Sequence, residues 1–267
     1  MRPMEPVRWP KAFDDPLWQY EIKWDGLRCI AKAVAGGVRL QGRSGADWTA
    51  QFPELAAALQ GSGRVFDGEL VVLEDGRPSF PAVMRSLRSG RGLVHYMVFD
   101  CLAANGRDLR PLPLDERRQE LGGLRQGPYV HKVDAVPGAG VALYRTACES
   151  GLEGVVAKRR DSPYIGGKSG LWRKIKCWRR IRCVVLGVES AKGEIRKVRL
   201  GLAQGGEVLG VGSVGNLGRA AAEELRLRLR QGPVLADVAY LDWTEGGQLR
   251  HPRWLGIAGG DSSGGGP

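Results

Sequence analysis

The chain has no long apolar run and few of the residues that build metal or disulfide scaffolds. No stretch approaches the roughly 18 consecutive apolar residues of a membrane-spanning helix, and the first residues lack the apolar segment of a signal peptide. The sequence holds 5 cysteines and 3 histidines, and no two cysteines have the spacing of a zinc or redox motif. We therefore expect a cytoplasmic protein with no membrane association, no zinc site, and reduced cysteines that serve as small apolar residues.

Basic residues are in excess. The 267 residues include 40 Lys or Arg against 29 Asp or Glu, a formal net charge of +11. Apolar residues make up 43% and charged residues 26% of the chain, as in globular proteins that fold into one large or two ordinary domains. The charge balance favours a polyanionic partner, most often a nucleic acid.

One stretch near the N-terminus, Tyr20 to Arg28, combines a strand pattern with an unusual charge arrangement. Tyr20, Ile22 and Trp24 alternate with charged residues, which predicts a strand with one buried face. The charged face carries Lys23 between two carboxylates, and a glycine then ends the strand. By itself this pattern fits either a solvated strand face with a salt bridge or a lysine nucleophile at a strand end.

Periodicity and turn signals predict an α+β fold, with antiparallel sheets flanked by helices in residues 1–177. We expect helices at Phe52–Leu59, Leu114–Leu124 and Ala139–Ser150, and a flexible basic loop from Lys158 to Gly170. Residues 178–258 read as five short strands with one helix at Ala220–Leu229, which suits a small OB-fold β-barrel. The Gly/Ser-rich end, residues 259–267, is expected to be disordered.

Several charged or aromatic residues are expected at strand ends of the first domain, and each alone is ordinary. A Glu after Asp-Gly is usually a turn residue, and a Phe on an apolar strand is usually core. The set comprises Lys23, Asp25, Arg28, Arg43, Glu69, Phe99, Glu153, Lys158, Lys174 and Lys176.

Together these residues form motifs in a recognisable order. Lys23-Trp-Asp-Gly-Leu-Arg28 resembles the first motif of the covalent nucleotidyltransferases, which include DNA and RNA ligases and mRNA capping enzymes. The segments that match the following motifs are Arg43-Ser-Gly45, Asp67-Gly-Glu69, Phe99-Asp100, Glu153-Gly-Val-Val-Ala-Lys158 and Trp172-Arg-Lys174-Ile-Lys176. From about Pro3 to Ile257, the amino-acid sequence is most similar to that of bacterial ATP-dependent DNA ligases, namely the ligase domain of ligase D and the stand-alone ligase C.

The resemblance implies a nucleotidyltransferase (adenylation) domain followed by an OB-fold domain. It also implies a reaction in which Lys23 takes AMP from ATP, AMP passes to the 5′-phosphate of a DNA nick, and the 3′-hydroxyl displaces it. An unperturbed lysine amine is mostly protonated at neutral pH, so activation by clustered cations is expected.

Further roles follow from the same resemblance. Glu153 would bind Mg²⁺ or Mn²⁺, and Asp25 offers a second hard oxygen ligand. Lys174 and Lys176 would contact the phosphates, together with Arg28 and Arg43, which also hold the ribose. The remaining nucleotide-binding residues would be Glu21 and Ile22 at the adenine edge, Glu69 at the ribose, Phe99 against the adenine ring, and Lys158.

The expected macromolecular partner is nicked double-stranded DNA, bound by a monomer at the nucleoid during repair or end joining, with proteins such as Ku possible by analogy. In the OB domain, a basic surface suited to backbone phosphates comprises Arg179, Arg180, Arg182, Lys192, Arg196, Lys197 and Arg199. An ordinary solvated barrel surface is the alternative.

The sequence departs from the family at its end. The family closes its OB domain with an Arg-x-Asp-Lys motif, whereas no Arg or Lys follows Arg253 here. Because Lys23 lies so near the start, we also expect no large N-terminal DNA-binding domain. The missing end motif leads us to expect slow self-adenylylation, or dependence on pre-adenylylated nicks or a partner chain. The alternatives are an RNA ligase, a GTP-using capping-type enzyme, and a degenerate ligase that acts as a DNA-binding module.

Overall fold

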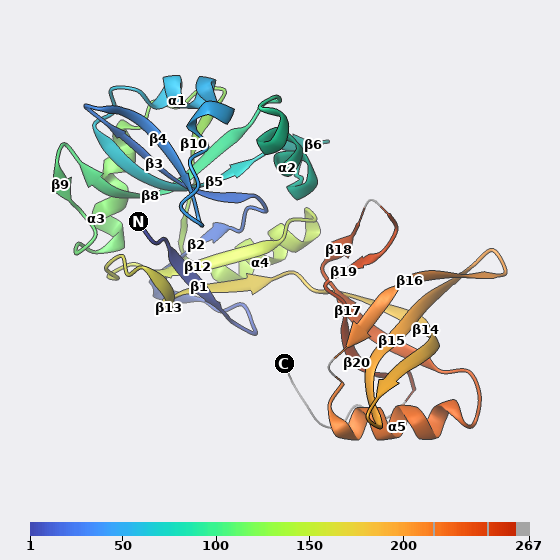
Figure 1. Ribbon diagram of the computed structural model, residues 1–267. Helices are drawn as coiled ribbons and strands as arrows, with labels where there is room; N and C mark the ends of the chain where they lie inside the picture. The colour runs from blue at the N-terminus through green and yellow to red at the C-terminus, as the bar shows by residue number, and fades with distance from the viewer. Residues whose placement is uncertain (216, 245, 260–267) are drawn as a thin grey trace. The chain divides into compact units, whose positions relative to one another are not determined.

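The chain folds into two compact units, Met1–Cys177 and Trp178–Pro267. The computed structural model (Figure 1) describes residues 1–215, 217–244 and 246–259. Within those ranges, no helix is long and apolar enough to cross a membrane. Apart from Gly259, the predicted disordered tail lies outside the described residues.

Two sheets form the frame of the first unit. The first sheet contains β1 (Met4–Arg8), β2 (Asp15–Ile22), β11 (Val136–Gly138), β12 (Gly154–Arg159) and β13 (Gly167–Lys176). The second contains β3 (Leu27–Val34), β4 (Gly37–Gly42), β5 (Arg64–Val71), β8 (His95–Ala104), β9 (Arg107–Asp108) and β10 (Val130–Lys132). Their strand orders are β1-β13-β12-β2-β11 and β10-β8-β5-β3-β4, with β9 paired to β8. A small hairpin comprises β6 (Leu73–Glu74) and β7 (Arg77–Pro78).

Most pairings are antiparallel, as predicted, but β1–β13 and β8–β10 are parallel. The predicted flexible loop up to Gly170 is wrong in its second half, because β13 already begins at Gly167. There, the backbone of residues 167–169 pairs with β1. Backbone pairing does not depend on side-chain composition, so a Gly/Ser-rich segment can join a sheet when a partner strand lies beside it.

Helices cover the outer faces of these sheets, as Figure 1 shows for α1 and α4. The helical segments of the first unit are η1 (Thr49–Gln51), α1 (Pro53–Leu59), α2 (Phe80–Ser89), α3 (Leu114–Gln119), η2 (Glu120–Gly123) and α4 (Gly140–Glu149). The second sheet packs with α1 in one buried apolar cluster, and the first sheet packs with α4 in another. A third cluster, with Ile30, Phe99 and Trp172, draws side chains from both sheets and fixes their separation.

Helix α2 was not predicted, although its caps are present in the sequence. The Ser79 hydroxyl accepts a hydrogen bond from the Ala82 N–H, and Gly90 ends the helix in the left-handed conformation with φ 65°. The predicted helix from Leu114 is shorter than expected, since α3 tightens into the 3₁₀ turn η2 after Gln119.

Gly26 explains why a glycine follows the Lys23 segment. A Cβ at this position would lie 2.1 Å from the Leu70 carbonyl oxygen, so only a glycine lets β3 begin this close to β5. Any side chain at residue 26 would push the strands apart next to the charged segment.

The expectation of reduced cysteines is wrong for one pair. Cys148 of α4 and Cys177, the residue after β13, form a disulfide, whereas Cys29, Cys101 and Cys183 are buried and free. The two partners are 29 residues apart in sequence, and only the packing of α4 on the first sheet brings them together. Spacing motifs cannot reveal such a pair.

The second unit contains a curled antiparallel sheet. Its elements are β14 (Arg179–Ala191), β15 (Glu194–Gln204), β16 (Glu207–Gly215), α5 (Arg219–Leu229), β17 (Leu235–Tyr240), β18 (Asp242–Trp243), β19 (Leu249–Arg250) and β20 (Arg253–Ile257). The main strand order is β16-β15-β14-β17-β20, and the sheet curls so that its edge strands β16 and β20 approach each other. The concave face and α5 share one apolar core, which includes Val198, Leu225 and Val238. The predicted α+β fold with an OB-type second part is confirmed.

Candidate active site

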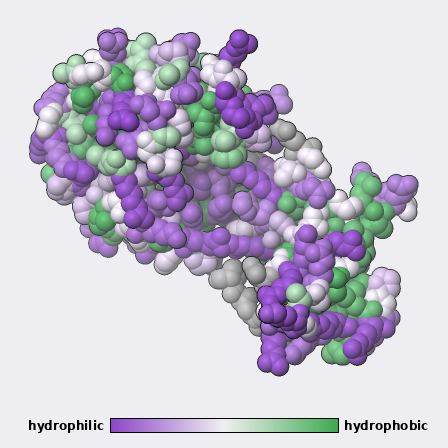
Figure 2. All heavy atoms as spheres, viewed as in Figure 1, coloured by the Kyte–Doolittle hydropathy of each residue, from purple (hydrophilic) through white to green (hydrophobic). Residues whose placement is uncertain are grey.

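A pocket of about 180 Å³ lies between the two sheets of the first unit. It is lined by side chains from β1, β2, β3, β5, β8, β12 and β13. Figure 2 shows hydrophilic residues around a hollow on this unit. Nine of the predicted site residues line the pocket: Glu21, Ile22, Lys23, Arg28, Arg43, Glu69, Phe99, Lys158 and Lys174. Segments that are far apart in the sequence therefore meet at one place.

Lys23 lies directly after β2 and pairs with a carboxylate. Its Nζ is 2.5 Å from Glu153 Oε2, while Lys176 Nζ is 2.7 Å from Glu153 Oε1. Both contacts follow from strand pairing, because the Lys23 N–H donates to the Gly154 carbonyl and Gly154 is in register with Lys176. Burial acts to raise the pKa of Glu153, but the charges and hydrogen bonds of Lys23 and Lys176 outweigh it and hold the pKa below its ordinary value.

Lys174 adds a third ammonium group to this cluster and lines the pocket. Burial lowers the pKa of Lys174, and the nearby charges of Lys23 and Lys176 lower it further. Three lysines with one shared carboxylate leave a net positive site, which suits a polyphosphate ligand.

Asp25 is partly buried and does not line the pocket of the described chain. Among the described residues, no group of three or more His, Cys, Asp or Glu side chains could hold a metal ion. Glu153, the other predicted metal ligand, lies next to Lys23 and pairs with it and with Lys176.

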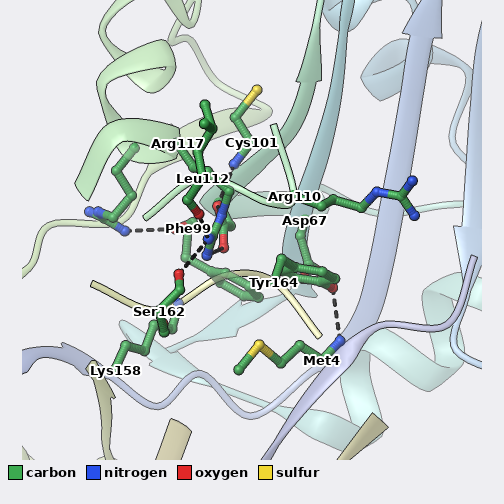
Figure 3. Close-up of polar contacts among 12 residues, drawn as sticks. Met4, Asp67, Phe99, Cys101, Arg110, Leu112, Arg117, Lys158, Ser162 and Tyr164 are labelled. Carbon is green, nitrogen blue, oxygen red and sulfur yellow. Dashed lines mark hydrogen bonds and ion pairs between the residues drawn. The ribbon is translucent and has the colours of Figure 1, made fainter. Parts of the chain in front are cut away.

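Arg28 lines the pocket, but most of its donors are already engaged. Its Nε and Nη2 donate to the two carboxylate oxygens of Asp67 at 2.6 and 2.7 Å, and Nη2 also donates to the Met4 carbonyl. The Tyr164 hydroxyl donates to Asp67 and accepts from the Met4 N–H (Figure 3). This network ties β1, β3 and β5 together on one side of the pocket.

Phe99 has a rigid support. The next residue, Asp100, is fully buried and accepts two hydrogen bonds from the buried Arg117 guanidinium at 2.9 and 2.8 Å. Arg117 also donates to the Leu112 and Ser162 carbonyls at 2.7 Å (Figure 3). The backbone beside Phe99 is thereby anchored, and the Phe99 side chain lines the pocket.

Glu21 and Lys158 are both buried. The alternation of apolar and charged residues around Lys23 would instead leave Glu21 on a solvated strand face. Each of the two side chains is 2% exposed, and Lys158 Nζ lies 2.6 Å from Glu21 Oε2. Burial lowers the pKa of Lys158 to about 8, although the Glu21 charge acts in the opposite direction. The Lys158 ammonium also lies 3.9 Å from the centre of the Phe99 ring and 4.3 Å from that of Trp172.

Glu69 comes from β5, opposite Arg28 of β3 in register. Burial raises the pKa of Glu69 to about 7, although the charges of Arg28 and Lys23 act to lower it. A carboxylate poised near neutrality can accept a hydrogen bond from a hydroxyl when it is ionised.

Arg43 is the most exposed of the predicted residues at the pocket, with a side-chain exposure of 68%. Its Nη2 lies 2.8 Å from Glu5 Oε2. Glu5 belongs to β1, and Pro3 and Pro6 line the same part of the pocket.

Sequence reasoning missed several pocket residues: Pro3, Glu5, Pro6, Val156 and Trp172, as well as Arg118 behind the wall. Trp172 and Val156 lie inside two of the family's motifs, so their positions in those motifs could have identified them as pocket residues. The β1 residues carried no comparable signal, because only the parallel pairing of β1 with β13 brings them to the pocket.

The predicted basic surface of the second unit is partly neutralised. Four of its seven residues form ion pairs with carboxylates, namely Arg179, Arg182, Arg196 and Lys197. Among the described residues, we find no ion pair for Arg180, Lys192 or Arg199, and all three are exposed.

Comparison with known proteins agrees with the family that the order of motifs predicts. Residues 8–176 match the family model of the ATP dependent DNA ligase domain. The multifunctional non-homologous end joining protein LigD of Pseudomonas aeruginosa is 35% identical over 90% of this chain and 33% of its own length. DNA ligase C1 of Mycolicibacterium smegmatis is 33% identical over 70% of this chain and 59% of its own. The chain thus spans about a third of the length of this LigD relative.

Solved structures agree with these matches. A mycobacterial DNA ligase D complexed with ATP and MES is 31% identical, with a TM-score of 0.62, over 96% of this chain and 94% of that one. The ligase domain of M. tuberculosis LigD is 30% identical over the same shares, also with a TM-score of 0.62. With the motif residues gathered at one pocket, the chain belongs to the ATP-dependent DNA ligase domain family.

Proposed function

We propose that the pocket binds ATP, transfers AMP to Lys23 and uses that AMP to seal 5′-phosphate/3′-hydroxyl nicks in DNA. The observation that carries the proposal is the chain of contacts Lys23–Glu153–Lys176 at the edge of a pocket lined by Glu69 and Phe99. A nucleophile, a cation-paired carboxylate and a stacking platform are the parts that covalent nucleotidyl transfer requires.

In the first step, Lys23 Nζ would form a P–N bond with the α-phosphorus of ATP as pyrophosphate leaves. Lys23 is paired as an ammonium with Glu153, so it must lose a proton before it attacks. Lys174 and Lys176 lie where they can stabilise negative charge that develops on the phosphates. Release of Lys23 from Glu153 would be the event that frees the nucleophile.

The nucleotide would lie with its adenine against Phe99 and beside the Glu21–Ile22 strand edge. Glu69 would accept a hydrogen bond from the ribose. Arg28 has a free Nη1 within the described residues, and the exposed Arg43 can reach a phosphate or the DNA end. Lys158 would act at the base end of the pocket, which its contacts with Phe99 and Trp172 support.

Glu153 fits a divalent cation that it shares with the nucleotide. A hard carboxylate oxygen suits Mg²⁺ or Mn²⁺, and Mg²⁺ commonly uses one or two carboxylates together with substrate phosphates. When bound, the metal would polarise the phosphate oxygens. Asp25 would then act near the site, outside the pocket lining, and its role as a ligand stays a prediction.

The DNA partner follows from the family and from the charge. The relatives include end-joining proteins named LigD, so we propose that this enzyme seals breaks in DNA repair or end joining at the nucleoid in the cytoplasm. Ku as a partner and a monomeric state stay part of the same proposal. Arg180, Lys192 and Arg199 of the second unit offer unpaired charges for backbone phosphates.

Intact-mass measurement tests the proposal directly. Purified protein incubated with ATP and Mg²⁺ or Mn²⁺ should gain one AMP, and it should then seal a nicked duplex. Lys23→Ala and Lys23→Arg should gain none, because neither provides an amine for the P–N bond, while Lys11→Ala, an exposed lysine of the same unit, should behave like the wild type.

A pre-adenylylated nick separates the steps. Lys23→Ala should still seal this substrate to a measurable extent, because AMP is already on the DNA. An AMP adduct or ATP-dependent sealing at the wild-type level in Lys23→Ala would refute the role of Lys23. A wild-type protein that seals neither nick would refute the ligase proposal.

A further inference from the structure

One cation near the lysine cluster of the pocket has no role in the steps described so far. Arg8 is the last residue of β1, the edge strand of the first sheet. Its side chain is exposed, and the described residues provide no hydrogen-bond or ion-pair partner for its guanidinium. All the N–H donors of this arginine are therefore available to an anion.

Strand register places Arg8 on the same face of the sheet as Lys174, which lines the pocket. Strands β1 and β13 are parallel neighbours (Figure 1), and Arg8 is in register with Lys174, so the two side chains leave the sheet on the same side. The residues beside them lie on the opposite face. There, the guanidinium carbon of Arg173 is 3.7 Å from the centre of a ring of Trp9.

Arg8 also lies close enough to Lys174 to influence its charge. Burial lowers the pKa of Lys174, and so do the charges of Lys23 and Lys176; the Glu153 charge acts in the opposite direction, and Arg8 lowers the pKa further. The Trp9 N–H donates to the Lys174 carbonyl at 2.9 Å, which holds the two strands together next to Arg8. Arg8 thus extends the cation cluster beyond the lining of the pocket.

The order of the strands gives this cluster a direction. Lys23 follows β2 and its partner Glu153 precedes β12, whereas Lys174 lies on β13 and Arg8 on β1. Across the sheet, these strands follow one another in the order β2, β12, β13, β1. In phosphoryl transfer the attacking and leaving atoms lie roughly in line with the phosphorus. Attack by Lys23 from the β2 side therefore directs the leaving group towards Lys174 and Arg8.

We propose that Arg8 binds the pyrophosphate leaving group, holding the β- and γ-phosphates of ATP beside Lys174 while Lys23 attacks. Lys23 Nζ forms the P–N bond and gives its ammonium protons to water. The bond between the α-phosphorus and the bridging oxygen breaks, and its electron pair leaves on pyrophosphate. A guanidinium can bind two phosphate oxygens at once and offset the charge that develops there. The proposal rests on lysyl-AMP formation in this pocket, as proposed above.

The test compares Arg8→Gln and Arg8→Lys with the wild type. Arg125→Gln is the matched control: Arg125 is an exposed arginine of the same unit, and it too forms no ion pair within the part of the chain that the structure describes. An exposed arginine also suits a backbone phosphate of DNA, so the measurements must separate the two anions. Circular dichroism and thermal melting check the fold of each variant.

Three reactions are measured for each protein. The first is lysyl-AMP formation at saturating ATP with Mg²⁺. The second is its reverse, in which purified lysyl-AMP protein is mixed with inorganic pyrophosphate and Mg²⁺, and loss of the adduct is followed by intact mass. The third is the sealing of a pre-adenylylated nick, in which pyrophosphate takes no part, together with a salt titration of nick binding.

Arg8→Gln should slow lysyl-AMP formation roughly tenfold and raise the half-saturating pyrophosphate concentration of the reverse reaction roughly tenfold, since a charge-assisted contact to the leaving group is lost. Sealing of the pre-adenylylated nick and the salt dependence of nick binding should stay unchanged. Arg8→Lys should lie between Arg8→Gln and the wild type, because it keeps the charge but not the two-pronged geometry. Arg125→Gln should match the wild type.

An unchanged half-saturating pyrophosphate concentration in folded Arg8→Gln would overturn the inference, even if lysyl-AMP forms more slowly, because a structural role alone would slow that step. Weaker nick binding with a lower salt slope and normal lysyl-AMP formation would assign Arg8 to the DNA backbone instead. If Arg8→Gln does not fold, Arg8→Lys decides by the same criteria.

The same data separate this inference from the ligase proposal. If the wild type forms lysyl-AMP and the Arg8 variants respond to pyrophosphate as it does, the inference on Arg8 fails while the ligase proposal stands. A wild-type protein that forms no adduct and seals neither nick overturns both.

Discussion

At the scale of single residues, the ionisation of Glu69 should make nucleotide binding in the pocket depend on pH. Burial raises the pKa of Glu69 to about 7, so the side chain is largely protonated at pH 6 and largely ionised at pH 7.5. Only the ionised form accepts a hydrogen bond at both oxygens, so nucleotide affinity should rise with pH through this range. The upper limit stays below the pKa of Lys158, which burial lowers to about 8.

We expect the half-saturating ATP concentration for lysyl-AMP formation to fall roughly eightfold between pH 6 and pH 7.5, as a single titration with this pKa requires. Glu69→Gln removes the titrating group, and it should bind ATP more weakly with a much smaller pH dependence. The same pH dependence in the variant as in the wild type would assign the titration to another group or to ATP itself.

At the scale of elements, the disulfide between α4 and the end of β13 fixes the strand that carries Lys174 and Lys176. The bridge joins residues 29 apart, and a closed loop of this length stabilises the folded state by roughly 3.6 kcal/mol in the chain-entropy model. The Cys177 N–H also donates to the Glu153 carbonyl, so the bridge and the Glu153 segment share one anchor.

Reduction of the oxidised protein should therefore lower the midpoint of thermal unfolding by roughly 7–14 °C. The measurement is a melting curve with and without a reducing agent. Cys148→Ser is the control, and its midpoint should be low and the same under both conditions. A wild-type midpoint that does not respond to the reducing agent would show that the bridge contributes no stability, or that it does not form in solution.

At the scale of the whole molecule, the net charge of +11 does not show which basic residues are available to bind DNA. In the second unit, Arg182 pairs with Asp237 at 2.9 Å, so its charge is partly satisfied within the protein. Arg180 and Arg199 are exposed, and the described residues include no ion-pair partner for either. The unpaired arginines should release more counterions when DNA binds.

We expect Arg199→Gln and Arg180→Gln each to weaken binding of a nicked duplex and to reduce the slope of log K against log salt by about 1. Arg182→Gln is the matched control, and its effect should be smaller because the native charge is already paired. The assay is a salt titration of nick binding with a fluorescent duplex. Equal slopes for all three variants would show that this surface does not bind DNA.

Local pattern was enough for much of the fold. Helix α4 and the strands β12, β14 and β15 follow the sequence signals, because apolar periodicity records which face of a segment is buried. The family was also evident from the sequence, since the residues around Lys23 and Glu153 match the motifs of the family. The parallel strand β1 was missed because the apolar pattern is weak over its 5 residues. Helix α2 was missed although the sequence carries both of its caps, Ser79 and Gly90.

The sequence by itself determined the family and the set of candidate site residues: the order of motifs from Lys23 to Lys176 predicts the family, and nine of the predicted residues line one pocket. Only the tertiary structure decided how they are paired. It placed Glu153 between Lys23 and Lys176, buried Glu21 against Arg118, and joined Cys148 to Cys177. These contacts depend on strand register and on helix packing across long sequence separations, which local pattern does not encode.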